Sequence, residues 1–285
     1  MAESTTTTTR AGMADFARRH PTIVVGALLL ALITLAAVCA PLIARDPIAF
    51  EPINRLKGPS AAFWLGTDSL GRDVYARMVY GARISLLVGL LVALISVVSG
   101  SVIGLLAGYF ARVDAVVMRL MDGIMAIPSI LLAIALVALL GASVKVVIIA
   151  IAIPEIPRVT RLVRAVVLSV RDLPFVEAAR SNGTRVAKLL RRHILPSTVA
   201  PLIVQATYIC ASAILTEAGL SFLGAGTPPE FPTWGNMIAS SRLYLQIAPW
   251  TIFAPGICLA LVVLAVNLVG DGLRDRLDPR ISRRM

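Results

Sequence analysis

The sequence has 285 residues, of which 58% are hydrophobic and only 15% are charged, and it carries a net charge of +11. Because soluble domains contain about a quarter charged residues, this composition excludes a disordered chain and argues against a soluble enzyme. The basic residues form short blocks between long apolar runs, which is the pattern of membrane topology and not of nucleic-acid binding. We therefore expect an all-α integral membrane protein that contacts lipid and binds no nucleic acid.

Six segments are predicted to cross the membrane as helices. A crossing needs about 20 apolar residues, and five uncharged stretches reach that length. A sixth stretch carries Glu155 and three arginines that recur every third residue, so one helical face could hold them at the membrane interface. The predicted helices are residues 21–44, 84–108, 113–141, 146–168, 197–220 and 249–271.

The distribution of basic residues predicts the orientation. With six crossings, 19 of the 27 Lys and Arg residues lie on the side of the N-terminus, and the positive-inside rule places that side, with both termini, in the cytoplasm. The first span could instead be a signal peptide, but its 24 uncharged residues exceed the roughly 7 to 15 of a signal sequence, which favours a retained anchor. Residues 1–20 and 272–285 are then cytoplasmic tails, the first partly disordered, residues 45–83 and 221–248 are external, and residues 169–196 form a cytoplasmic loop.

The external segment between the first two spans contains a polar motif. Residues 65–77 read LGTDSLGRDVYAR. Thr67 or Asp68 can cap a helix, and Asp73 and Arg77 have the spacing of an i,i+4 ion pair. The motif is compatible with a structural helix start outside the membrane and equally with a substrate contact.

Small residues in the second span predict how it packs. Gly100, Gly104 and Gly108 recur every four residues and share one helical face. Small residues at this spacing let two helices approach closely in a membrane. We expect this face to pack against another helix of the same chain rather than to form a dimer.

Two acidic residues lie at membrane depth beside arginines. Because a charge at that depth is costly, it is expected to have a partner. Asp122 has Arg119 three positions earlier, and Glu155 has Arg158 three positions later. Both pairs are predicted to be structural ion pairs on one helix.

The cytoplasmic loop at residues 169–196 has the sequence of two short helices. Pro174 suits the first turn of a helix, Gly183 suits its end, and Thr184 can cap a second helix. Five basic residues between Arg180 and Arg192 would also suit an amphipathic loop lying on anionic lipid. Lipid attraction does not account for a glutamate, a glycine and a proline at fixed spacing.

The loop carries a resemblance to a known family. Six of its residues have the spacing of the EAA loop of binding-protein-dependent ABC importer permeases, namely Glu177, Ala178, Ala179, Gly183, Leu195 and Pro196. His193 stands where the general pattern has an apolar residue, and the dipeptide and oligopeptide branch often has a histidine there. Residues 65–77, 216–237 and 267–280 also resemble this branch, so the likeness covers nearly the whole chain from residue 21.

The resemblance implies the six-helix type I importer (MetI-like) permease fold in the bacterial cytoplasmic membrane, with residues 84–271 as the permease transmembrane domain. It implies that the loop is a coupling helix docked on an ATP-hydrolysing subunit. The implied partners are a homologous second permease, two ABC ATPase subunits or one fused ATPase, and an external substrate-binding protein. ATP and Mg would be held by the ATPases. The implied cargo is a dipeptide or oligopeptide, with glutathione, a nickel chelate and haem left open.

The sequence contains no motif for ATP hydrolysis or other catalysis, as expected for a subunit that depends on partners. None of Lys57, Lys145 and Lys188 follows a glycine as the lysine of a Walker A motif does. The two histidines and three cysteines lack the spacing of a metal or catalytic site, so we expect no catalytic residue, metal or cofactor in this chain. The alternative is a gradient-driven secondary transporter or channel with Glu217 or Asp122 as its proton site. Glu217 has no basic residue nearby in the sequence. If the chain is an importer subunit, Glu217 is the candidate to face the translocation path or the companion permease.

Overall fold

The computed structural model describes residues 21–277, and regular structure in this range is helical apart from one β-bridge between Thr67 and Asp73. The predicted tail at residues 1–20 and the end of the second tail, residues 278–285, lie outside the described residues. The elements are α2 (Pro21–Val38), α3 (Ala40–Ile43), the 3-10 turn η1 (Pro52–Asn54), α4 (Val74–Tyr109), α5 (Ala111–Met125), α6 (Ser129–Leu140), α7 (Val144–Val170), α8 (Pro174–Ser181), α9 (Val186–Leu189), the π-helical turn η2 (Leu190–Ile194), α10 (Leu195–Phe222), α11 (Trp234–Ser241), the 3-10 turn η3 (Arg242–Tyr244) and α12 (Trp250–Leu277).

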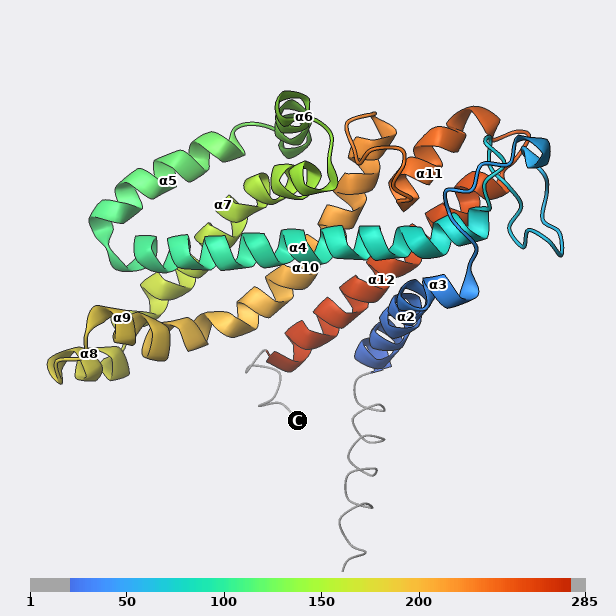
Figure 1. The fold of residues 1–285 in the computed structure, drawn as a ribbon. Helices are drawn as coiled ribbons and strands as arrows, with labels where there is room; N and C mark the ends of the chain where they lie inside the picture. The colour runs from blue at the N-terminus through green and yellow to red at the C-terminus, as the bar shows by residue number, and fades with distance from the viewer. Residues whose placement is uncertain (1–20, 278–285) are drawn as a thin grey trace, which may run out of the picture.

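Helix α4 packs closely on α7 through its glycine face, and the two helices run past each other in Figure 1. A Cβ added at Gly104 would lie 2.7 Å from the carbonyl oxygen of Thr160 and 2.8 Å from Cβ of Val163. Gly100 and Gly108 approach α7 as closely. The predicted packing within the chain is confirmed, and it brings the second and fourth predicted spans together.

Helix α10 contacts α4, α7 and α12, while α2 lies on the outside of α12 (Figure 1). The contact of α2 with α12 also uses glycines: a Cβ added at Gly26 would lie 2.8 Å from the carbonyl oxygen of Ala265. One buried apolar cluster joins α4, α6, α7 and α10, and a second joins α2, α4, α11 and α12. Side chains on the outer faces remain exposed, such as Leu28 and Leu35 of α2 and Leu90 of α4, each at least 60% exposed. Lipid or a partner subunit has to cover such a surface.

The predicted span at residues 113–141 is not one continuous helix. This segment consists of α5 and α6, which are bent by 87° at a short break. Pro128 precedes α6, and a proline has no backbone N–H to continue the helix and pushes the residue before it out of the helical conformation. The first predicted span is interrupted as well, because α2 ends at Val38 and the single turn α3 follows with Pro41 in its first turn.

Four helical segments are long and apolar enough to cross a membrane, namely α2, α4, the run from Val186 to Phe222, and α12. The bent pair of α5 and α6 makes a fifth if it counts as one span. Helix α7 covers the predicted span at residues 146–168 without a break, although Pro154 and Pro157 lie inside it. Helix α4 starts at Val74 rather than at residue 84. Six crossings with both termini in the cytoplasm stay a prediction.

Candidate functional site

The loop at residues 169–196 folds as two short helices joined at a glycine, as its sequence predicts. Helix α8 starts at Pro174, and Gly183 follows its end with a φ of +73°. The backbone N–H of Gly183 donates to the Arg180 carbonyl at 3.0 Å, and that of Thr184 donates to the Ala179 carbonyl at 3.1 Å. These two bonds form a Schellman motif, whose left-handed position favours glycine.

One detail of the predicted loop is wrong. Thr184 was the predicted cap of the second helix, but the residue before α9 is Arg185, and its side chain makes no capping hydrogen bond. The backbone N–H of Thr184 is used to close the first helix instead. The turn therefore caps the C-terminal end of α8 rather than the N-terminal end of α9.

Buried side chains fix the loop to the rest of the chain. Val176, Leu189 and Ile194 are fully buried in the cluster shared with α4, α7 and α10. The guanidinium of Arg171 donates to the carbonyl of Gly108 at 3.0 Å, and the guanidinium carbon of Arg180 lies 6.0 Å from the centre of the Tyr109 ring. The loop is thus held in a defined orientation at the end of α4.

The opposite face of the loop is exposed. The carboxylate of Glu177 makes no ion pair within residues 21–277, and Phe175 beside it is 48% exposed. Ala178 and Gly183 are also exposed, and Ala179 is half-buried. An exposed aromatic ring next to an unpaired carboxylate and small residues is a surface suited to a protein partner.

The second helix of the loop continues into a long helix. From Val186 to Phe222, α9, η2 and α10 form one helical run of 37 residues. The π-helical turn η2 stands just before α10, where Leu195 is half-buried and Pro196 is exposed in the first turn. A proline nitrogen cannot donate a hydrogen bond, and an irregular turn at this point accommodates the loss. Residues of the loop and the far end of α10 therefore belong to one element.

Glu217 lies near the far end of α10 and is fully buried. Its Oε1 accepts hydrogen bonds from the hydroxyls of Ser221 at 2.9 Å, Thr233 at 3.0 Å and Thr227 at 3.3 Å. Its Oε2 has no hydrogen-bond partner among the described residues. The carboxyl group is enclosed by its own chain in this conformation, so its predicted place on a translocation path or against a second permease stays a prediction. Sequence reasoning missed its partners because two of them lie in the loop after α10.

The family model described as "Binding-protein-dependent transport system inner membrane component" matches residues 100–283. The match covers more than half of the chain and includes the whole loop described above. This chain belongs to that family. It is therefore an inner membrane component of a transport system, and as an ABC transporter permease it is a translocation subunit.

Curated relatives of this transport component match along nearly its whole length. It is 60% identical over 268 residues to the probable peptide ABC transporter permease protein y4tQ of Sinorhizobium fredii, which covers 94% of this chain and 92% of the relative. It is 46% identical over 267 residues to the dipeptide transport system permease protein DppC of Alkalihalophilus pseudofirmus, covering 93% and 88%. It is 43% identical over 271 residues to the glutathione transport system permease protein GsiD of Escherichia coli, covering 94% and 89%.

A solved structure supports the fold of the permease. An inward-facing structure of the MetNI methionine ABC transporter matches with a TM-score of 0.57 and 18% identity, covering 71% of this chain and 96% of that chain. The predicted MetI-like fold of a type I importer is thereby confirmed.

The two acidic residues predicted to lie beside arginines at membrane depth have partners, but not always the predicted ones. Glu155 pairs with Arg158, with 3.1 Å between Oε1 and Nη1, as predicted. The predicted pair of Asp122 with Arg119 is wrong, because Asp122 contacts Arg161 of α7 instead. Helix α5 packs against α7, so Asp122 finds its partner on another helix, which the local sequence does not reveal.

Two ion pairs connect α7 to α5. Arg161 contacts Asp122, and Arg164 makes two hydrogen bonds to Asp114, one of them 2.6 Å between Nη2 and Oδ2. The arginines of the fourth predicted span therefore meet carboxylates of the permease rather than only the membrane interface.

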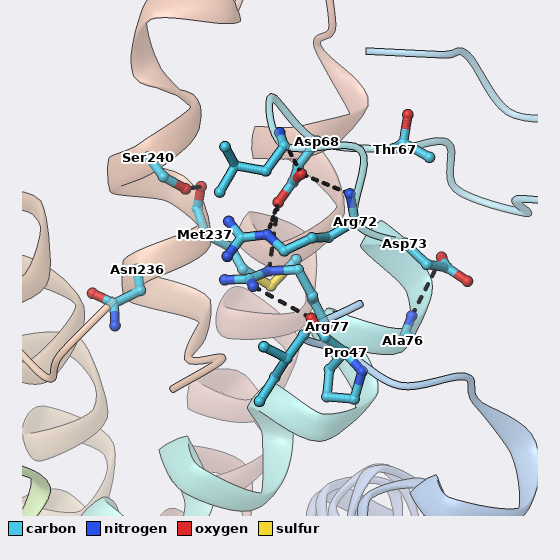
Figure 2. Close-up of polar contacts among 12 residues, drawn as sticks. Pro47, Thr67, Asp68, Arg72, Asp73, Ala76, Arg77, Asn236, Met237 and Ser240 are labelled. Atoms are coloured by element: carbon cyan, nitrogen blue, oxygen red, sulfur yellow. Dashed lines mark hydrogen bonds and ion pairs between the residues drawn. The ribbon is translucent and has the colours of Figure 1, made fainter. Parts of the chain in front are cut away.

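The polar motif at residues 65–77 also differs in detail from its prediction (Figure 2). Asp73, rather than Thr67 or Asp68, caps α4, and its Oδ1 accepts the backbone N–H of Tyr75 at 2.9 Å. The predicted pair of Asp73 with Arg77 is wrong because this carboxylate is occupied by the cap. The guanidinium of Arg77 instead faces Asp68, with 3.7 Å between Nε and Oδ2.

The hydrogen bonds of Glu217 lead to a prediction about the loop at residues 223–233. Glu217→Leu removes the acceptor of three buried hydroxyls, and we expect a loss of about 2–4 kcal/mol in the free energy of unfolding. Amide hydrogen exchange in residues 223–233 should accelerate. Glu217→Gln keeps an acceptor oxygen at the same place and should exchange at close to the wild-type rate. Equal exchange in both variants would show that these bonds do not hold the loop.

Proposed function

We propose that this chain is one of two homologous permease subunits of a peptide importer in the bacterial cytoplasmic membrane. The other subunits are a second permease, two ABC ATPases or one fused ATPase, and an external substrate-binding protein. Relatives named as peptide and dipeptide permeases support this cargo class. The observation that carries the proposal is the exposed face of the loop at residues 169–196. The opposite face of this loop is anchored to the rest of the chain by buried side chains.

The ATPases hold ATP and Mg, and this chain binds neither. An ATPase subunit contacts Phe175, Glu177 and Ala178, and Glu177 attracts a basic residue of that partner. Because Val176 and Leu189 are buried in the core of the permease, a movement of α8 carries the neighbouring ends of α4 and α10 with it. ATP and the loaded binding protein are then the two ligands that favour opposite states of the permease.

A gradient-driven transporter has less support. A proton site needs access to water at some stage of transport, yet Glu217 is fully buried and Asp122 is paired with Arg161. Such a transporter would also have no use for an exposed docking face on the cytoplasmic loop. Peptide uptake that survives loss of the ATPases and stops with an uncoupler would favour this alternative.

Cross-linking tests the docking face directly. In a variant with Cys39, Cys210 and Cys258 replaced by serine, we expect Ala178→Cys to form a cross-link to an ATPase subunit in membranes that contain the complete importer. A short reagent with a maleimide at one end and a succinimidyl ester at the other is suitable, because Ala178 is exposed beside Glu177 and the ester acylates a lysine amine of the partner with loss of N-hydroxysuccinimide.

The matched control is Leu243→Cys, which is 81% exposed in the predicted external segment and should react with maleimide without joining an ATPase. Labelling of Ala178→Cys only after the cytoplasmic side is opened would support the predicted orientation. A reactive Ala178→Cys that never joins an ATPase would overturn the docking face and favour a loop lying on lipid.

A further inference from the structure

A cavity with an unusual set of charges lies between the start of α4, the loop after α10 and α11. Its volume is about 330 Å³, near the lower end of the range for small-molecule pockets. Arg72, Arg77 and Arg242 line it, and its wall contains no acidic residue. Phe222 and Pro229 give the wall an apolar part.

The two inner arginines share one carboxylate, which belongs to Asp68 (Figure 2). The Nε of Arg72 lies 2.7 Å from Oδ2 of Asp68, and the Nε of Arg77 lies 3.7 Å from the same oxygen. The other oxygen of Asp68 already accepts the backbone N–H groups of Leu70 at 2.8 Å and Arg72 at 2.9 Å. A single negative charge therefore faces two positive charges and is nearly saturated with hydrogen bonds.

The outer ends of these guanidinium groups are available to a ligand. Figure 2 shows the groups of Arg72 and Arg77 side by side, pointing toward α11 and Ser240. Within residues 21–277, the side chain of Arg72 donates only through Nε, and the terminal nitrogens of Arg77 donate only to the carbonyl of Pro47 at 3.4 Å. Both side chains line the cavity, and their remaining N–H groups have no hydrogen-bond partner among the described residues.

Burial makes this arrangement costly without an anion. The side chain of Arg72 is 11% exposed and that of Arg77 is 2% exposed, so water screens their mutual repulsion poorly. A carboxylate in the cavity would supply the missing negative charge and would match the fork of N–H donors that a guanidinium presents.

We propose that this cavity binds the C-terminal carboxylate of a peptide during import. The proposal rests on the proposed function, because it takes the cargo to be a peptide. The inner arginines line a cavity, which the end of a small peptide can enter more readily than a side chain on the surface of a folded partner. The apolar wall then contacts the last side chain of the peptide.

Protection from a chemical reagent tests the site without transport. Phenylglyoxal reacts with arginine, and mass spectrometry measures the adduct at each position of the purified importer in lipid nanodiscs. The probes are acetyl-trialanine with a free C-terminus and its C-terminal amide, which differ by one negative charge. The free acid, at about ten times its Kd, should slow the reaction of Arg72 roughly tenfold by mass action, and the amide should not.

Arg55 is the internal control, because it is exposed in the same external segment but does not line the cavity. Its reaction should be unchanged by either peptide. Equal protection of Arg72 by acid and amide, protection of both arginines, or no protection would each overturn the proposed site.

Transport by Arg72→Gln distinguishes cargo from binding protein as the source of the carboxylate. We expect peptide uptake to fall about tenfold, as for loss of a charge-assisted hydrogen bond, while stimulation of ATP hydrolysis by the binding protein is kept. Arg72→Lys should recover part of the uptake.

A parallel loss of stimulation would mean that an acidic residue of the binding protein occupies the cavity, and would overturn the assignment to cargo. A wild-type importer that transports no peptide would count against the proposed function. The protection assay would still decide the site in that case.

Discussion

Glu177→Lys is expected to reduce peptide uptake to background while the protein remains in the membrane. The substitution reverses the charge on an exposed face that is proposed to dock on an ATPase, and like charges across an interface are strongly unfavourable. The side chains that anchor the loop, Val176, Leu189 and Ile194, are unchanged and keep the fold intact. Uptake into membrane vesicles and the amount of permease in the membrane are the two measurements.

The same loop offers a matched pair of substitutions at Gly183. With a φ of +73° and no atom within 4 Å of an added Cβ, this position restricts backbone conformation but not volume. Gly183→Val should lower uptake about tenfold, because a branched residue in the left-handed region costs about 1–3 kcal/mol and displaces α9 relative to α8. Gly183→Asn should retain most activity, since asparagine tolerates this conformation. Normal uptake in Gly183→Val and Glu177→Lys together would defeat the assignment of the loop.

Gly104→Leu is expected to prevent accumulation of folded permease. An added Cβ would lie 2.7 Å from a backbone carbonyl of α7, and backbone cannot move aside as a flexible side chain can. Overpacking of this kind costs about 1–3 kcal/mol for extra methylenes and more where backbone is forced apart. The free energy of unfolding should therefore fall by at least that amount.

The control is Gly256→Leu, in a helix where an added Cβ meets nothing within 4 Å. It should accumulate as wild type, because leucine favours a helix more than glycine does. Size-exclusion profiles of fluorescent fusions and resistance to trypsin report the folded fraction. Wild-type behaviour of Gly104→Leu would contradict the close contact of α4 with α7.

The sequence predicts features that depend on local spacing better than features that depend on distant partners. The glycine face of α4 and the two helices around Gly183 follow from residues that are close in the chain, and both are present. The partners of Asp122 and Asp114 lie 39 and 50 residues away, so no local pattern reveals them. The break before Pro128 had a local signal that hydropathy alone overlooks, since a proline within an apolar run often ends a helix.

In the candidate site, too, local spacing predicts the residues, whereas contacts between distant segments are not predicted. The loop residues were located by spacing, but their anchoring depends on buried side chains that only the fold brings together. The i,i+4 spacing predicts a pair of Asp73 with Arg77, whereas the unsatisfied N–H groups at the start of α4 bind the carboxylate of Asp73 instead. The cavity was not foreseen, because its arginines come from two segments about 170 residues apart.

The helical run from Val186 to Phe222 joins the loop to the far end of α10, although it contains the π-helical turn η2 and Pro201. At about 1.5 Å per residue, 37 residues extend roughly 55 Å, enough to join the proposed docking face to the buried carboxyl of Glu217. If the segments on either side of the π-helical turn move together, a tilt of about 10° at one end displaces the other end by roughly 10 Å. A modest rotation at the proposed docking face would therefore arrive amplified at the far end of α10.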